Sequence, residues 1–246
     1  MDHEIIYHIA SDDKELGRWI QPAIKMLPEW YKDLKKEADN VEDGGHVNVK
    51  TCVSFLYLWQ NSYLMLCPCD IEIDVGPDGY EVYVTDEKAV RFTSHTYEED
   101  APRNQMGSKF NPDWMNIKFE FPISVMTTEH RIDLIWQQPF YWDQQQEIIT
   151  APGMLPLLPN RSTGMNVNTF INKSRRRTIK VPKGFPVASI YSASGKLKFI
   201  QEPDRRIFLA TANTQMQRFE ASVYYKASRT CPYHEPNTDD IKERKL

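Results

Sequence analysis

The sequence predicts a mainly β protein of the α+β class. It fits a β-sandwich or a jelly-roll or cupin-like barrel, with a short helical arm at the N-terminus. Two observations predict this class. Segments of about five residues rich in β-branched and aromatic side chains recur along the chain. Turn sequences separate these segments at intervals of about eight to twelve residues, a spacing typical of sandwiches and barrels.

The pattern along the chain predicts three parts. Residues 1–45 are expected to form the helical arm, because one short strand at 5–9 precedes apolar residues with helical spacing over 16–27. Residues 46–231 contain the recurring strand-like segments and form the β-rich domain. Residues 232–246 are polar and charged, which predicts a tail outside the core.

The strongest local pattern is a β-hairpin over residues 71–84. Both of its strands alternate apolar and polar side chains, and Gly76-Pro77-Asp78-Gly79 between them is a turn sequence. Ser192-Ala193-Ser194-Gly195 also has the composition of a hairpin turn. Residues 55–59 fit either a buried strand or a short helix, because periodicity does not separate the two at that length.

Composition and charge exclude several classes of protein. The 246 residues are 41% hydrophobic, which is enough for a core without disulfides or metals, and too much for a disordered chain. The net charge of −4 gives no positive field to attract phosphate, so nucleic acid is not an expected partner. No apolar run reaches the roughly 18 residues of a membrane span, and the acidic start lacks a signal core, so a cytoplasmic location is expected.

The cysteines raise the question of a zinc site. Cys67, Cys69, Cys231 and His234 would supply three sulfurs and one imidazole, a set that suits tetrahedral zinc. The Cys-x-Cys spacing is tighter than zinc sites usually have. The favoured interpretation is therefore that Cys67 and Cys69 are small buried side chains at the end of a strand, in a chain whose thiols stay reduced.

A metal oxygenase on a cupin-like barrel would need two histidines and one carboxylate around iron. His95 and His130 are each followed three residues later by an acid, Glu98 and Asp133. That gap places the two side chains on opposite faces of a strand. No Gly-x-Ser-x-Gly motif or glycine-rich phosphate loop occurs either. The main expectation is thus that no cofactor is bound, with zinc or iron as the alternative.

Two charged groups are candidate binding features. Arg175 and Arg177, in a basic run, are expected to share one strand face that binds phosphate or an acidic partner. The alternative is a charged strand edge that discourages pairing with other chains. Asp70, Glu72 and Asp74 share one face of their strand, which suits either a cation or plain contact with solvent.

Aromatic side chains are densest around residues 136–142. Trp136, Tyr141 and Trp142 are candidates for a surface that binds a sugar or a protein partner. In a small-ligand barrel, Trp136 and Trp142 would line the cavity. The alternative is ordinary core or interface packing.

Short segments in order along most of the chain carry a resemblance: Trp30-Tyr31, Lys50-Thr51-Cys52, Pro68-Cys69-Asp70-Ile71, Trp142, Thr150-Ala151-Pro152-Gly153 and Leu158-Pro159-Asn160. Through them the chain resembles a group of uncharacterised proteins from tailed bacteriophages and bacteria. The resemblance implies a phage-encoded origin. It supplies no catalytic residues, because the group has no assigned activity.

Together these patterns predict a non-catalytic β-rich protein that acts by surface binding or self-association, as a phage accessory or virion component. The expected partner is another protein or a second copy of the chain, and neither nucleic acid nor a membrane. If the chain is phage-encoded, the expected location is the host cytoplasm or the virion. The alternatives are a cupin-like metal-dependent enzyme of the oxygenase type and a small-ligand binding barrel.

Overall fold

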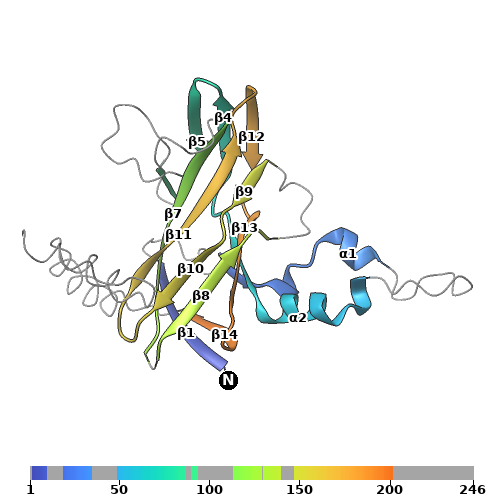
Figure 1. Cartoon of the computed structure of the whole chain (residues 1–246), viewed down its shortest axis with the longest axis vertical. Coiled ribbons are helices and arrows are strands. Elements are labelled where there is room, and N and C mark those ends of the chain that lie inside the picture. The colour runs from blue at the N-terminus through green and yellow to red at the C-terminus, as the bar shows by residue number, and fades with distance from the viewer. Residues whose placement is uncertain are drawn as a thin grey trace, which may run out of the picture. The chain divides into compact units, whose positions relative to one another are not determined.

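Strands make up most of the regular structure (Figure 1). The computed structural model describes residues 2–9, 19–34, 49–86, 90–93, 113–128, 130–139 and 147–201. The strands are β1 (Asp2–Ile9), β2 (Ile20–Pro22), β3 (Tyr63–Leu66), β4 (Ile71–Gly76), β5 (Gly79–Val84), β6 (Arg91–Thr93), β7 (Trp114–Met126), β8 (Ile132–Gln137), β9 (Ile148–Thr150), β10 (Gly153–Leu157), β11 (Thr163–Asn172), β12 (Arg177–Val181), β13 (Pro186–Ser192) and β14 (Lys196–Gln201). The helices are α1 (Glu29–Asp33) and α2 (Val53–Asn61), and short 3-10 turns lie at Ala23–Lys25 and Val49–Thr51.

The strands form three sheets. The six-stranded sheet has the order β14-β1-β7-β11-β9, with β6 also paired to β7. The five-stranded sheet has the order β10-β8-β13-β3-β2, and the three-stranded sheet has the order β12-β4-β5. All of these pairs are antiparallel except β1 with β14, which is parallel. The prediction of a mainly β, sandwich-like fold is confirmed.

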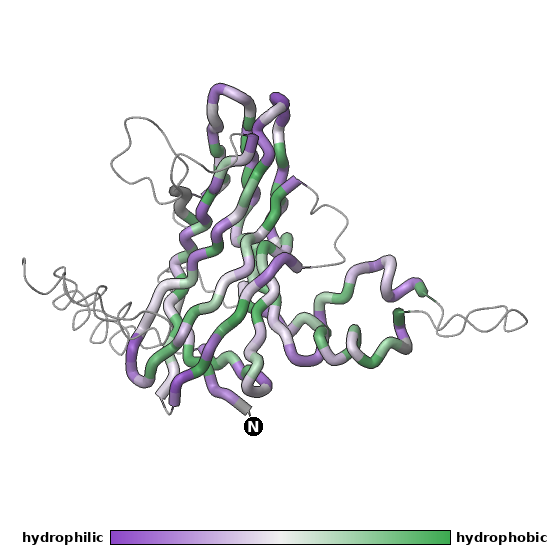
Figure 2. The backbone as a smooth tube through the Cα atoms, in the orientation of Figure 1, coloured by the Kyte–Doolittle hydropathy of each residue, from purple (hydrophilic) through white to green (hydrophobic). Residues whose placement is uncertain are grey.

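One hydrophobic core joins the three sheets. Side chains alternate between buried and more exposed along β4 and over much of β7 and β11, as expected for strands with one face on a core. Hydropathy changes in the same way along the backbone (Figure 2). The core contains fully or almost fully buried side chains from each sheet, including Ile5, Ile117 and Phe119 from the six-stranded sheet, Met65, Leu134 and Ile190 from the five-stranded sheet, and Ile71, Ile73 and Ile179 from the three-stranded sheet.

The three-stranded sheet continues the five-stranded sheet through a bend. β3 leads into β4, and β12 leads into β13, so the antiparallel pair β4-β12 lies next to the antiparallel pair β3-β13 along the strands. At the bend, the Cys67 amide donates to the Phe185 carbonyl at 2.7 Å, and the Gly184 amide donates to the Cys67 carbonyl at 2.7 Å. Gly184 has φ of 85°, a conformation that favours glycine. The Asp70 carboxylate accepts the Lys183 amide at 2.8 Å, which fixes the start of β4 against β12.

The local turn predictions had different outcomes. The hairpin over residues 71–84 is confirmed, with Ile71 opposite Val84, and Gly79 has the positive φ (138°) that this tight turn requires. Residues 55–59 lie in the helix α2. The prediction of a hairpin around Ser192-Ala193-Ser194-Gly195 is wrong, because β13 and β14 belong to different sheets. Turn composition shows where a chain changes direction, but it does not select the strand with which the next segment pairs.

The N-terminal residues contribute to two cores. β1 pairs with both β7 and β14 inside the six-stranded sheet. α1 instead packs with α2 in a second cluster, where Tyr31 stacks on Phe55 and Trp59 at ring-centroid distances of 5.2 and 6.5 Å. None of the helices in the described part of the chain is long and apolar enough to cross a membrane. Residues 232–246, the predicted tail, lie outside the described residues.

Candidate functional site

The outer face of the three-stranded sheet gathers charged and polar side chains from three strands. Ile71, Ile73 and Val75 of β4 point into the core, so Glu72 and Asp74 lie on the opposite face. The strand register then places six residues on this face, which we call the acidic face: Glu72, Asp74, Glu81, Tyr83, Thr178 and Lys180. Tyr83 is 52% exposed. The acidic face thus combines three carboxylates with one exposed aromatic side chain.

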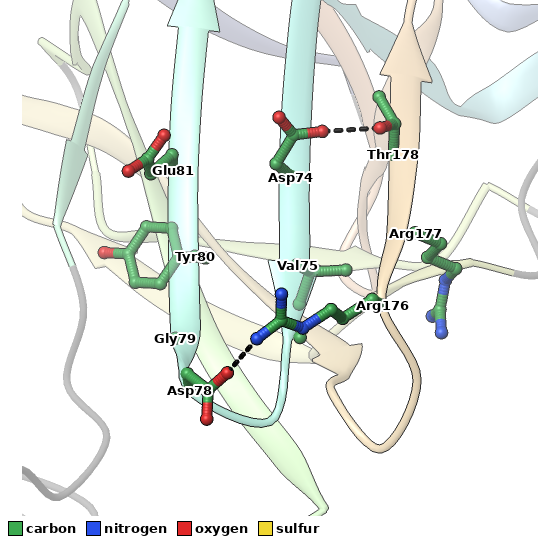
Figure 3. A pocket seen from close by; sticks show the side chains of 10 residues that line it. Asp74, Val75, Asp78, Gly79, Tyr80, Glu81, Arg176, Arg177 and Thr178 are labelled. Carbon is green, nitrogen blue, oxygen red and sulfur yellow. Dashed lines mark hydrogen bonds and ion pairs between the residues drawn. The ribbon is translucent and has the colours of Figure 1, made fainter.

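The acidic face is hollowed at both ends. A groove of about 550 Å³ at the hairpin end is lined by Asp74, Asp78, Glu81, Arg176 and Thr178, among others (Figure 3). A second groove of about 470 Å³ is lined by Asp70, Glu72, Tyr83, Thr85 and Lys180, among others. Both grooves are open to solvent, so they suit side chains presented by a partner better than a buried small molecule.

Two carboxylates of the acidic face lie directly opposite each other. Asp74 of β4 is the register partner of Glu81 of β5. The Thr178 hydroxyl donates to Asp74, and the Tyr83 hydroxyl donates to Glu81. In the described part of the chain, no Lys or Arg forms an ion pair with either carboxylate. Neutral hydroxyls therefore hold both side chains in place, and neither carboxylate has an ion pair within the described residues.

The other carboxylates at this site do have cationic partners. Lys180 Nζ lies 3.3 Å from Glu72 Oε2. Arg176 donates to Asp78 at the tip of the hairpin (Figure 3). A Cβ at Gly76 would lie 2.8 Å from Arg176 Cγ, so the glycine leaves room for the arginine stem. The negative charge is therefore concentrated at Asp74 and Glu81, between these two ion pairs.

The ionisation of Tyr83 reports the same negative field. Its hydrogen bond to Glu81 and the charge of Glu81 are the largest causes that raise the pKa of Tyr83 above its ordinary value, and the charges of Asp74 and Glu72 add to them. A cation brought to this face would reverse that effect, since it would favour the ionised phenol.

The structure separates the two predicted arginines. β12 begins at Arg177, and Arg175 lies in the exposed turn before it, so the expectation of one shared strand face is wrong. Arg177 Nε lies 3.3 Å from Glu147 Oε1, and the side chain points away from Asp74 and Asp78 (Figure 3). The run of positive charge is thus divided among different acidic partners.

The predicted aromatic site is described only at Trp136. Trp136 of β8 is partly buried against the main core and lies directly opposite Gly153 of β10. A Cβ added at Gly153 would lie 2.5 Å from the indole, so the ring covers the glycine. Tyr141 and Trp142 lie outside the described residues.

The described cysteines of the predicted zinc set are buried at the bend between β3 and β4. Cys67 is 1% exposed and its thiol donates to the Cys69 carbonyl at 3.1 Å. Burial is the largest cause that raises the pKa of both thiols. Cys231 and His234 lie outside the described residues, within which no three His, Cys, Asp or Glu side chains gather as metal ligands.

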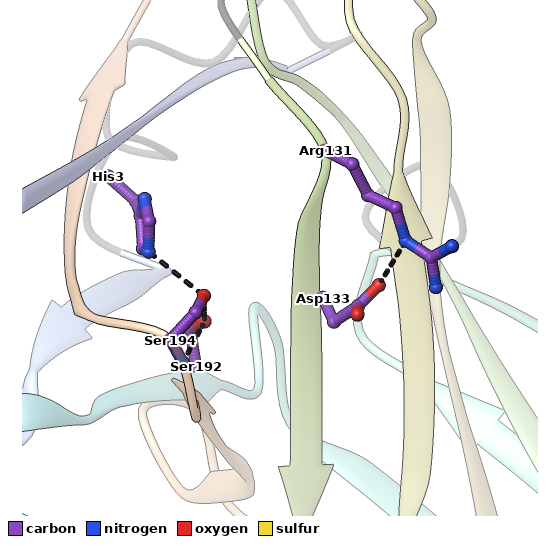
Figure 4. A network of polar contacts seen from close by, with 5 residues as sticks. All are labelled: His3, Arg131, Asp133, Ser192 and Ser194. Carbon is purple, nitrogen blue, oxygen red and sulfur yellow. Dashed lines mark hydrogen bonds and ion pairs between the residues drawn. The ribbon is translucent and has the colours of Figure 1, made fainter.

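A second polar site joins three distant segments of the chain. His3 of β1 is 3% exposed, and its Nδ1 lies 2.8 Å from His130 Nε2. His3 Nε2 lies 2.9 Å from the Ser194 hydroxyl (Figure 4). Asp133 does not join this network, because it accepts from Arg131 Nε at 2.9 Å. His95, the other histidine proposed for an iron site, lies outside the described residues.

Sequence reasoning missed His3, Ser194, Glu81 and Tyr83 as site residues. His3 and Ser194 are 191 residues apart, and no sequence motif links them. Glu81 and Tyr83 had a usable signal, since the predicted hairpin sets them opposite the predicted carboxylate row.

The fold and these sites define a mainly β, sandwich-like protein with one charged sheet face and one separate histidine–serine network. No family model, curated protein or solved structure matches the chain. The resemblance to proteins of tailed bacteriophages and bacteria therefore stays a prediction.

Proposed function

We propose that the protein acts by binding another protein through the acidic face, and that the partner inserts lysine or arginine side chains into the two grooves. One observation carries the proposal: Asp74 and Glu81 lie opposite each other and are held by hydroxyl groups without a cation. Charge complementarity makes a cationic partner segment the occupant that this face fits best.

The arrangement costs stability, which supports a role in binding. Like charges directly opposite each other on neighbouring strands destabilise a sheet. A cation between Asp74 and Glu81 would remove this repulsion and gain two charge-assisted hydrogen bonds. The exposed Tyr83 beside them adds a side-chain type that is enriched in protein interfaces.

The test uses a fluorescein-labelled peptide of alternating lysine and threonine as the probe. Its binding to the full chain is measured by fluorescence anisotropy in low-salt buffer. Each exposed charge pair contributes about 0.2–1 kcal/mol, so the double variant Asp74→Asn/Glu81→Gln should weaken binding by roughly 2–30-fold. Added salt should weaken the wild-type interaction too, because both charges are exposed to solvent.

The matched control is Glu29→Gln/Asp33→Asn on α1, which removes the same charge from two exposed positions away from the acidic face. Its affinity should stay close to that of wild type. If both double variants lose affinity equally, the peptide responds to net charge and the proposal is wrong. It is also wrong if wild type does not bind the peptide.

The double variant also separates lost binding from lost folding. Asn and Gln each keep one oxygen that accepts from Thr178 or Tyr83, so both hydrogen bonds are retained while the charge is removed. Asp74→Asn/Glu81→Gln should therefore unfold at the same urea concentration as wild type or at a higher one. A variant that is weaker in both binding and stability would show that these carboxylates support the fold.

A further inference from the structure

The histidine–serine network has the geometry of an activated nucleophile. Three side chains form a chain of contacts, with Ser194 Oγ 2.9 Å from His3 Nε2 and His3 Nδ1 2.8 Å from His130 Nε2. A hydroxyl within hydrogen-bond reach of an imidazole, which a third group orients, is the arrangement that activates serine in unrelated hydrolases. The His3 and His130 rings are tilted by 59°, so they meet through their nitrogens and do not stack.

Regular strand pairing holds the base in position. β1 runs parallel to β14, with Asp2 opposite Lys196 and His3 opposite Leu197, and this register brings His3 to the turn that precedes β14. His3 is almost fully buried, whereas Ser194 is exposed. His3 is thus fixed on a strand and shielded from water, while the serine that it contacts lies in an exposed turn.

The turn also restrains the serine. The Ser194 amide donates to the Ser192 hydroxyl at 3.3 Å, and the two hydroxyl oxygens lie 2.9 Å apart. A neutral His3 has one nitrogen that donates and one that accepts. If Nδ1–H donates to His130, then Nε2 is left to accept the Ser194 proton. In that arrangement His130 acts as a positioning residue, because accepting from Nδ1–H selects the tautomer required of a base.

We propose that Ser194 is a nucleophile for acyl transfer, with His3 as its general base, and that it hydrolyses carboxylic esters that reach the turn from solvent. Ser194 Oγ bonds to the ester carbonyl carbon while its proton moves to His3 Nε2. The carbon–oxygen bond to the alcohol then breaks, and His3 returns the proton to the departing alcohol. Water hydrolyses the acyl-serine through the same base and releases the acid. This activity is independent of the acidic face.

The test is labelling of the full chain with a fluorophosphonate, which reacts with activated serines, followed by mass-spectrometric identification of the labelled residue. Ser174 is the internal control, because it is also exposed on a turn but donates its hydroxyl proton to Asn172 Oδ1, which is no base. Ser194 should be labelled at least about 100-fold faster than Ser174, the low end of what a positioned base contributes.

Variants separate the roles of the three side chains. Ser194→Ala should abolish labelling and the hydrolysis of p-nitrophenyl acetate, whereas Ser174→Ala should leave both unchanged. His3→Gln should slow labelling of Ser194 by about 100-fold or more, since glutamine forms hydrogen bonds but takes up no proton. Free imidazole should restore labelling in His3→Ala, a result that a merely structural histidine would not give.

His130→Phe tests the positioning role, since it removes the nitrogen that faces His3. It should slow labelling, and imidazole should not restore it. The proposal is overturned if Ser194 in the wild-type chain reacts no faster than Ser174. That comparison needs no variant, so it holds even where a histidine substitution prevents folding. A folded His3→Gln chain that labels at the wild-type rate would overturn it too.

Discussion

Gly153 provides a direct test of the packing between β8 and β10. It lies opposite Trp136, and a Cβ at this position would lie 2.5 Å from the indole Cε2 and Nε1 atoms and 2.7 Å from Cζ2. The indole is rigid, so the ring cannot bend away and has to swing off the strand. Gly153→Ala should therefore displace Trp136 and destabilise the protein.

The magnitude follows from two opposing effects. Forcing an extra methyl group into a packed contact costs about 1–3 kcal/mol. Replacing glycine by alanine also reduces the conformational freedom of the unfolded chain, which stabilises the folded state by about 0.4–1 kcal/mol. The net loss of stability for Gly153→Ala is then about 0–2.6 kcal/mol.

Gly164→Ala is the matched control. Gly164 also lies in a strand, β11, and a Cβ there would have no atom within 4 Å. The effect on the unfolded chain is similar for both glycines, so the difference between the two variants isolates the contact with Trp136. Gly164→Ala should be as stable as wild type or about 0.4–1 kcal/mol more stable.

The assay is urea unfolding followed by circular dichroism, with the midpoints compared at constant slope. Adding Trp136→Val removes the obstructing ring, so Gly153→Ala should cost much less in that background, with a coupling of about 0.5–3 kcal/mol. Equal midpoints for Gly153→Ala and Gly164→Ala would refute the proposed contact. The contact would also be refuted if Gly153→Ala lowered the free energy of unfolding by the same amount in the Trp136→Val background as in wild type.

Three further predictions concern the cysteines and one buried hydroxyl group. Cys52 is exposed and should react with iodoacetamide in the folded protein, whereas Cys67 and Cys69 should stay protected, as peptide mapping would show; equal rates would contradict their burial. Burial raises the pKa of the Cys67 thiol, so the stability that this thiol contributes is complete below its ordinary pKa of 9.0 and is lost as the pH rises further. The free energy of unfolding should therefore fall above about pH 9, and it should fall by less in Cys67→Ala than in wild type. The Thr150 hydroxyl donates to the Val187 carbonyl at 2.6 Å and so links β9 to β13 of the other sheet. Thr150→Val removes this hydroxyl and should lower the free energy of unfolding, measured in urea, by about 1–3 kcal/mol. No loss of stability would show that this link between the sheets is dispensable.

The sequence by itself determined the local features of the fold. Alternation over residues 71–84 and the turn at Gly76–Gly79 specify a hairpin, because both strands and their connection are contiguous. The same alternation placed Glu72 and Asp74 on one face of β4, since successive side chains of a strand point to opposite sides. Two carboxylates of the predicted row, Glu72 and Asp74, are thus correctly placed, whereas Asp70 lies before β4 and accepts the Lys183 amide instead.

Only the tertiary structure decided which distant segments meet. The composition of Ser192–Gly195 predicts a turn, but it does not predict that β14 lies in a different sheet from β13. β14 pairs with β1, the first strand of the chain, although the two are far apart in the sequence. That choice brings Ser194 to His3, and the β4-β12 pairing brings Thr178 to Asp74. The physical reason is that alternation specifies which face of a strand is buried, whereas the partner of each strand depends on how all the sheets close around one shared core.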